Sequence, residues 1–454
     1  MPLFQKKDLN LLLENSIARE KTYGLLDLVL LGVGAIIGTG ILVLTGIIAA
    51  TDAGPAVVVS FIISAIAATI IGLCYAEVSS SIPCSGSIYG YAWVVLGQFP
   101  AHLLGWTMIG VYILTAATVA NGWTGYFNAL LLDFHITLPE ELLHTPIQGG
   151  LINLPSVIIV LVISFLLTRG SKESKMVNNM MVLIKLVIIT LFIVVGVFYV
   201  EPGNWTPFAP FGVQGIFAGA ATAFFSFLGF DALATTAEEV KDVQKTLPKA
   251  IILSVLVATT LYVAVCLIMT GMMKYTFLDV PEAMTFVMKV AGQDVVAAII
   301  AAGSVIGILA VILAFILGSS NIIMSMGRGG FLPKTFSTMN KKYQSPNRAI
   351  WTVGILTAVF SGLMDVKSLA NLANIGSLIA FAVICFIVIR FRQTHPDVKR
   401  DFKVPFTPLV PILGIAICLF LVANLDAMSW VVFLIWLLLG TLFYFTYSKK
   451  HIEN

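Results

Sequence analysis

Long apolar runs alternate with short polar segments along almost the entire chain. Each run is close to the length of about 20 residues that a helix needs to cross the hydrocarbon core of a membrane. The runs lie near residues 24–50, 55–80, 100–131, 152–169, 177–200, 213–236, 249–272, 294–326, 348–364, 368–391, 407–425 and 428–447. This pattern predicts an all-α membrane protein with twelve transmembrane helices.

The composition agrees with this pattern and excludes a soluble protein. Of the 454 residues, 59% are hydrophobic and 11% are charged, and the mean hydropathy is +0.99. Soluble domains carry about 25% charged residues. The five cysteines and five histidines are scattered and form no CxxC or other ligand spacing. We therefore expect no metal site, no cofactor and no nucleic-acid partner.

The distribution of positive charge gives the expected orientation. Cytoplasmic loops of membrane proteins carry an excess of Lys and Arg. With twelve spans and a cytoplasmic N-terminus, nearly all of the 26 Lys and Arg fall on the inner side; the exceptions are Lys274, Lys289 and Lys367 outside and Lys185 within the fifth run. This predicts a multi-pass protein of the cell membrane with both termini in the cytoplasm. The longest outer stretch, 132–150, is acidic and is expected to be a solvated loop.

Glycines interrupt the first apolar run. The segment Gly32–Gly40 contains four glycines and a threonine, and each glycine within a helix costs roughly 1 kcal/mol relative to alanine. One interpretation is tight helix packing through the pair Gly34 and Gly38. The other is a half-helix, a short unwound segment and a second half-helix, an arrangement tolerated at membrane depth only where it is buried in protein or lines a cavity. A nucleotide-binding glycine loop needs a preceding strand, which an apolar run of this length does not provide.

The sixth run repeats this anomaly, because small residues lead into Gly229 and Asp231 at membrane depth. The two interrupted runs are five spans apart, so the second must enter the membrane from the opposite side. This predicts an inverted repeat of five plus five helices, with broken helices 1 and 6 and two further C-terminal helices. The expected division is a cytoplasmic N-terminus (1–23), a first repeat (24–200), a second repeat (201–391), helices 11 and 12 (392–447) and a cytoplasmic tail (448–454).

Two broken helices that meet at mid-membrane can hold a zwitterion. Carbonyl groups that end a half-helix attract a cation, and amide groups that begin the next half attract an anion. The expected substrate-binding residues are Ile36, Ile37, Gly38, Thr39, Gly40 and Ile41 in the first run and Phe225, Ser226, Phe227 and Leu228 in the sixth. An α-amino acid fits these groups, as do other small zwitterions.

Several motifs resemble the amino acid-polyamine-organocation superfamily, and within it the cationic-amino-acid-transporter branch. They are Gly34–Gly40, Phe224–Asp231, Ala237–Lys241, Leu247–Pro248 and Phe402–Pro405. The resemblance covers nearly the whole chain. It implies the leucine-transporter-type fold, a substrate amine held by carbonyls of spans one and six, and a substrate carboxylate held by the amides after Gly38.

Lys185 is the only basic residue inside an apolar run. Such a residue is costly in a membrane and is a candidate for function. The alternative is snorkelling, in which the lysine stem carries its ammonium group back to the interface. The resemblance implies that protonation of a lysine at this position replaces a bound sodium ion, so that Lys185 would couple transport to protons.

The chain departs from the family pattern around the expected side-chain pocket, for which we expect Val111 and Phe315. It has Gly110-Val111-Tyr112 where members often have Leu-Glu-Tyr, and Phe227 where a tyrosine is frequent. These changes remove an acid and a hydroxyl, and they favour a neutral, apolar substrate side chain.

Three further acidic residues have two interpretations each. Asp231 lines the broken helix or caps its second half. Glu238 and Glu239 form a solvated cytoplasmic face or a salt-bridging inner gate.

The sequence therefore predicts a secondary active transporter that moves amino acids by alternating access. The partners that we expect are an amino-acid substrate, protons and the lipid bilayer, with the protein acting as a monomer. The alternatives are a cationic amino acid transporter, an uncoupled amino-acid exchanger and an amino-acid sensor with a transporter fold. An enzyme is not expected, because the apolar runs contain no HExxH motif and no paired carboxylates.

Overall fold

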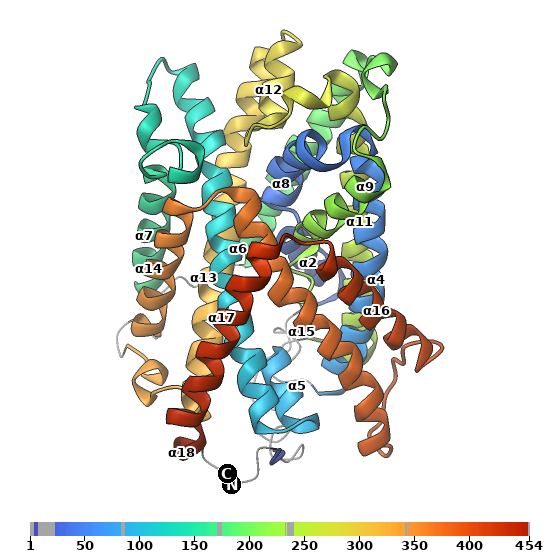
Figure 1. The fold of residues 1–454 in the computed structure, drawn as a ribbon, viewed down its shortest axis with the longest axis vertical. Helices are drawn as coiled ribbons and strands as arrows, with labels where there is room; N and C mark the ends of the chain where they lie inside the picture. Colours follow the sequence, from blue (N-terminus) through green and yellow to red (C-terminus); the bar gives the residue numbers. More distant parts are fainter. Residues whose placement is uncertain are drawn as a thin grey trace.

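Helices packed side by side make up the protein (Figure 1). The computed structural model describes residues 4–7, 23–82, 87–169, 175–231, 233, 240–340, 343 and 345–452. Within these residues no strand forms, and an isolated backbone bridge pairs Tyr23 with Val240. The all-α prediction is confirmed.

The helices follow the apolar runs of the sequence. In the first part of the chain they are α2 (Leu25–Ile36), η1 (Gly40–Leu44), α3 (Thr45–Ile48), η2 (Ala49–Ala53), α4 (Val57–Ser81), α5 (Ser87–Val95), α6 (Gln98–Asp133), α7 (Leu154–Thr168) and α8 (Lys175–Gly196). In the second part they are α9 (Gly212–Ala223), η8 (Phe224–Phe227), α11 (Val243–Met272), α12 (Ala283–Val290), α13 (Asp294–Arg328), α14 (Asn347–Leu363), α15 (Val366–Thr394), α16 (Leu409–Ala423), α17 (Ala427–Phe443), η12 (Tyr444–Ser448) and α18 (Lys449–His451). Seven helical stretches of the described chain are long and apolar enough to cross a membrane, and four further apolar helices are shorter.

The first and sixth runs are interrupted where the glycines lie. Helix α2 ends at Ile36, and Ile37 has an extended backbone (ψ 100°) before helical structure resumes in η1. Helix α9 tightens into the 3-10 turn η8, after which Leu228 is extended (ψ 137°) and Gly229 has a φ of 120°. Both predicted breaks are therefore present.

Helix α6 packs along α13, α15 and α14, while α11 packs on α4 and on α2. Figure 1 shows α6 near the middle of the bundle, with α7 and α14 together at one side. The short α12 and the residues before it cover the second half of the first broken span, since a Cβ on Gly46 would lie 2.6 Å from Ala283 and 2.7 Å from the carbonyl oxygen of Leu278. This cover was not anticipated from the sequence.

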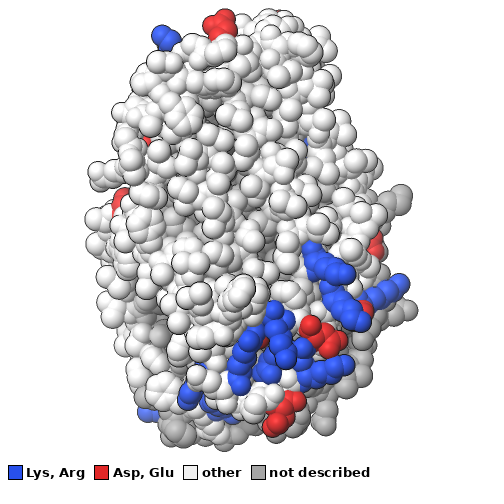
Figure 2. All heavy atoms as spheres, turned by 90° about the vertical axis from the view of Figure 1, so that its right-hand side faces the viewer, with Lys and Arg blue, Asp and Glu red and all other residues white. Residues whose placement is uncertain are grey.

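Charge is concentrated at one end of the molecule. Figure 2 shows Lys and Arg gathered toward the lower end, while the surface above is almost free of charge. Helix α18 lies at this same end (Figure 1). The N-terminal residues 4–7 also pack there, because the Gln98 amide donates to the Gln5 carbonyl at 3.1 Å and the ring of neighbouring Phe99 lies 5.0 Å from that of Tyr444.

The prediction of a solvated loop for residues 132–150 is only partly right. Glu140, Glu141 and Asp133 are exposed. Leu138 and Leu142, however, turn toward α6 and α7 and form part of an apolar pocket with them. The loop folds back because burying these leucines removes apolar surface from water.

Candidate substrate site at the two helix breaks

The two breaks touch each other at two points. A Cβ on Gly229 would lie 2.6 Å from the carbonyl oxygen of Ala35, and a Cβ on Gly40 would lie 2.5 Å from the Cα of Ser226. Real Cβ atoms do not approach other atoms so closely, so a residue with a side chain would separate the segments. Gly229 also has a positive φ that L residues rarely adopt. Glycine at these positions lets backbone meet backbone at the centre of the bundle.

Carbonyl groups at the end of α2 lack helical partners, and two buried side chains bind them. The Lys185 ammonium donates to the carbonyl oxygens of Gly34 and Ile37, both at 3.1 Å. The Tyr262 hydroxyl lies 3.0 Å from the carbonyl oxygen of Ile36. These partners satisfy backbone groups that a helix end leaves open.

Lys185 lies inside the bundle and not at the interface. Its side chain is 2% exposed. The stem of the side chain runs against α13, because a Cβ on Gly307 would lie 2.8 Å from the Lys185 Cγ. The ammonium points to the break in α2, so in this structure the lysine does not snorkel.

Tyr262 of α11 connects the two breaks and was not singled out from the sequence. Besides Ile36, its hydroxyl lies 2.6 Å from the carbonyl oxygen of Ser226. Its ring packs edge-on against Phe227, with centroids 5.1 Å apart, and against Phe61 at 5.4 Å. A buried tyrosine within an apolar run is the signal that could have found it, since its hydroxyl must have a partner there.

Two side-chain hydroxyls at the breaks are buried without a partner. Among the described residues, Thr39 Oγ1 and Ser226 Oγ make no hydrogen bond. Thr39 follows the first break and Ser226 precedes the second, and Gly40 packs on Ser226. Because an unpaired buried hydroxyl costs free energy, these groups are available to a polar ligand.

The structure brings the expected substrate-binding residues together in a buried position. All ten belong to the two broken segments and are less than one tenth exposed: Ile36, Ile37, Gly38, Thr39, Gly40, Ile41, Phe225, Ser226, Phe227 and Leu228. Glu238 and Glu239 lie outside the described residues.

The two expected pocket residues face different helices. Val111 packs against Gly376 of α15, where a Cβ would lie 2.7 Å from the Val111 Cγ2. Phe315 instead packs edge-on against Tyr112, with ring centroids 5.4 Å apart. The neighbour Tyr112 is therefore a better candidate than Val111 for a residue that acts together with Phe315.

Tyr112 also holds Asp231 just after the second break. The Tyr112 hydroxyl donates to Asp231 Oδ2 at 2.7 Å, and the Gly229 amide donates to Oδ1 at 3.2 Å. Gly229 precedes the second half of the broken span, and Tyr112 lies on α6. Residues 232 and 234–239, to which a cap would bind, lie outside the described residues, so both interpretations of Asp231 stay open.

An ion pair at the charged end was also missed. Glu77 of α4 is 1% exposed, and Arg392 of α15 binds both of its carboxylate oxygens, at 2.7 and 2.6 Å. The Val404 amide donates to the same carboxylate at 2.6 Å. Together these contacts join α4, α15 and the segment before α16.

Residues 23–443 match the family model of amino acid permeases. The chain belongs to this family. Its interrupted helices and the burial of their break residues are therefore features of a permease, which is a transporter and an integral membrane protein rather than an enzyme. The resemblance inferred from the motifs is confirmed.

Two curated relatives of this permease cover nearly its whole length, and a third covers most of it. The methylthioribose transporter of Bacillus subtilis (strain 168) is 45% identical over 99% of this chain and 98% of its own. The branched-chain amino acid permease BcaP of the same organism is 44% identical over the same shares. The vacuolar cationic amino acid transporter 2 of Arabidopsis thaliana is 34% identical over 82% of this chain and 59% of its own.

Proposed function

We propose that this permease carries neutral amino acids with apolar side chains across the cell membrane. It does so by alternating access, in a fold of twelve spans whose two halves, residues 24–200 and 201–391, are inverted copies. Helices 11 and 12 (392–447) complete the fold, and the N-terminal segment (1–23) and the tail (448–454) lie in the cytoplasm. The two broken helices, five apolar runs apart, support this arrangement.

The observation that carries the proposal is the meeting of two helix breaks whose polar groups are not all used. Among the described residues, the hydroxyls of Thr39 and Ser226 have no partner, and the carbonyl groups of Ile36 and Ser226 share the single hydroxyl proton of Tyr262. Carbonyl oxygens suit an ammonium group, while hydroxyls and the amides that open η1 suit a carboxylate. A zwitterionic amino acid matches this set without a charged side chain.

Apolar residues around the breaks support a neutral substrate side chain. Phe225, Phe227 and Phe315 are all buried beside the broken segments. Both carboxylate oxygens of Asp231 already accept hydrogen bonds from the protein, from Tyr112 and from the Gly229 amide. The similarity to a permease for branched-chain amino acids agrees with this preference.

Lys185 is the proposed site of proton coupling. Its ammonium binds the carbonyl oxygens of Gly34 and Ile37 at the end of α2. Loss of the proton would remove the positive charge and weaken both contacts, which would change the stability of the break, so protonation would bias one conformation over another. Glu238 and Glu239 are proposed as an inner gate. The acting unit is proposed to be a monomer.

Methylthioribose is a second candidate substrate, because a transporter of that name is 45% identical to this chain. A thioether and a neutral sugar would use the hydroxyls of Thr39 and Ser226 but would leave the ammonium-binding carbonyl groups unused. A competition experiment on uptake distinguishes the two candidate substrates.

The experiment is uptake of labelled leucine by purified permease in liposomes, with a pH gradient that is acidic outside. We expect unlabelled isoleucine, valine and methionine to inhibit uptake, and arginine and lysine to leave it unchanged. If the permease takes up methylthioribose and does not take up leucine, then the substrate is the sugar and not an amino acid. Inhibition by arginine and lysine alone would establish a cationic transporter.

A further inference from the structure

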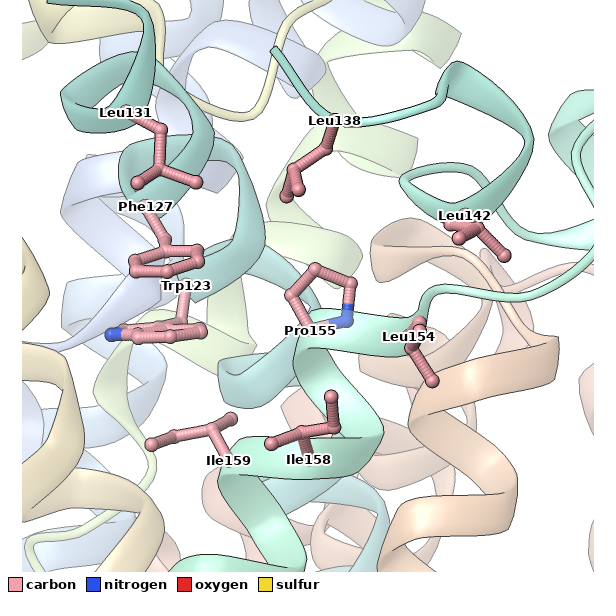
Figure 3. Close-up of a pocket in the computed structure, with 9 residues that line it drawn as sticks. All are labelled: Trp123, Phe127, Leu131, Leu138, Leu142, Leu154, Pro155, Ile158 and Ile159. Atoms are coloured by element: carbon pink, nitrogen blue, oxygen red, sulfur yellow. The ribbon is translucent and has the colours of Figure 1, made fainter. Parts of the chain in front are cut away.

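An apolar pocket lies between α6 and α7, away from the helix breaks (Figure 3). Its volume is about 300 Å³, and all nine side chains that line it are apolar. Trp123, Phe127 and Leu131 follow one another along α6, and the rings of Trp123 and Phe127 are stacked with centroids 4.6 Å apart. Helix α7 supplies the opposite wall, and the loop after α6 closes the end.

The pocket offers nothing to a polar ligand. The indole N–H of Trp123, a donor on one of the lining side chains, donates to the Val305 carbonyl of α13 at 3.1 Å. An amino acid or a sugar would lose its hydrogen bonds with water on entering and gain none. Water is excluded for the same reason, because apolar cavities of this size stay dry.

The pocket is long enough for part of a lipid chain. It begins at Trp123, and α6 ends at Asp133, so the walls extend about 15 Å along the helix. This is about half of the hydrocarbon thickness of a bilayer. Leu138 and Leu142 of the outer loop cover the end nearest the surface (Figure 3).

The open side of the pocket is continuous with the lipid-facing surface of α7. Ile158 lines the pocket and is 52% exposed. Val162, Phe165 and Leu166 continue the exposed apolar surface along the same helix at helical spacing. What fills the pocket therefore comes from the membrane and not from water.

We propose that this pocket binds one acyl chain of a membrane phospholipid and holds it against α6, α7 and the outer loop. Inside a bilayer, exclusion from water gives no advantage to the pocket over the surrounding lipid, so close packing is what holds the chain. The concave walls supply that packing on three sides, whereas the open surface at Phe165 and Leu166 supplies it on one. The pocket is separate from the substrate site, because Gly122, on the other face of α6, packs against Thr39 and Val43.

The test uses the full-length protein, delipidated in detergent and titrated with a phosphatidylcholine that carries a diazirine at the end of one acyl chain. After irradiation, mass spectrometry locates the label. We expect labelling of residues 123–131 and 154–159 to saturate at one lipid per protein. Labelling of the surface around Phe165 and Leu166 should rise in proportion to the lipid added.

Two variants form a matched pair. Ile159→Trp fills the pocket from α7 and should abolish the saturable labelling, whereas Leu166→Trp adds the same ring to the open surface and should leave it unchanged. The unfolding temperatures of both variants, compared with that of the wild-type protein, report that they are folded.

Proportional, non-saturating labelling of the pocket in the wild-type protein would overturn the proposal by itself, whether or not Ile159→Trp folds. Unchanged labelling in folded Ile159→Trp would do the same.

Discussion

Gly40 and Ser226 lie so close together that a methyl group on Gly40 would be 2.5 Å from the Cα of Ser226. They belong to different halves of the chain, and their contact joins the two broken helices. Gly38, only two residues earlier, has room, because a methyl group there would meet Val311 at an ordinary 3.5 Å. The two glycines should therefore respond differently to the same substitution.

Gly40→Ala should strongly reduce uptake, and Gly38→Ala should retain most of it. Overpacking at Gly40 costs about 1–3 kcal/mol and forces the two breaks apart. The measurement is the initial rate of leucine uptake, corrected for the amount of each variant in the membrane. Equal rates for the two variants would mean that the contact of the breaks is not needed for transport.

Lys185→Met should retain substrate binding and lose uptake driven by a pH gradient. Methionine keeps much of the stem that packs on Gly307 but removes the ammonium that binds Gly34 and Ile37. Leucine binding is measured on purified protein, and accumulation is measured in liposomes with and without the gradient. Leu183→Ala, on the exposed face of the same helix, is the control. Normal pH-driven accumulation in Lys185→Met would remove the lysine from the coupling mechanism.

Tyr262→Phe should weaken substrate binding while the protein remains folded. The ring contacts with Phe61 and Phe227 are kept, but the hydroxyl that meets the carbonyl oxygens of Ile36 and Ser226 is lost. One hydrogen bond is worth about 0.5–1.5 kcal/mol, which corresponds to roughly two- to tenfold in the dissociation constant. The dissociation constant for leucine checks this, with Tyr447→Phe at the charged end as control. An unchanged constant would show that Tyr262 serves packing alone.

Arg392→Ala should lower the temperature of unfolding much more than Arg390→Ala. The first change removes the guanidinium that binds both oxygens of the buried Glu77 carboxylate and leaves Arg400, whose Nε lies 4.0 Å from Oε1, as the nearby cation. We expect a loss near the lower end of the range for buried pairs, about 3 kcal/mol, because the Arg392 side chain is 28% exposed. Arg390 bonds only to nearby Gln393 at the surface. A thermal unfolding assay on purified protein measures the unfolding temperature of each variant. Equal shifts for the two variants would contradict a structural role for the pair of Arg392 and Glu77.

Glu282→Gln should stabilise the protein at neutral pH, with a gain that disappears in acid. Burial raises the pKa of Glu282, at the start of α12, above its usual value of 4.5, and the positive charge of Lys289 offsets only part of this. The ionised form is therefore disfavoured in the folded state, so the wild-type protein loses stability as the pH rises from the usual pKa through the raised one. Unfolding temperatures of both proteins across this pH range provide the test. A constant difference at all pH values would exclude titration of Glu282 as the cause.

The sequence predicted the helices well because apolar length is a strong signal in membranes. It also located both breaks, since glycine is expensive in a helix and is kept where backbone must meet backbone, as Gly40 and Gly229 do. Other features depend on helices that are distant in sequence. The direction of the Val111 and Tyr112 side chains follows from the packing of α6 on α13 and α15.

Tyr262 and Glu77 were missed for a similar reason. Each lies in an apolar run, and its partners lie far away in sequence. Tyr262 binds carbonyl groups of two other segments, and Glu77 binds Arg392 and Val404. Partners that are so distant in sequence cannot be recognised from the residue types next to Tyr262 or Glu77 in the chain. The folding back of Leu138 and Leu142 onto α6 and α7 also could not be derived from the acidic character of their loop.

The contacts of Lys185 with carbonyl oxygens have a consequence for how this protein can vary. Every residue type carries a backbone carbonyl, so replacing the side chain of Ile37 does not remove the acceptor. The Ile37 carbonyl is in this sense protected against point mutation. At Gly34 a side chain would clash with Val182 and displace the chain, so this acceptor is lost through a change in the path of the chain. Residues that shape the pocket for the substrate side chain can therefore be exchanged during divergence, while the charge at the break in α2 keeps its place.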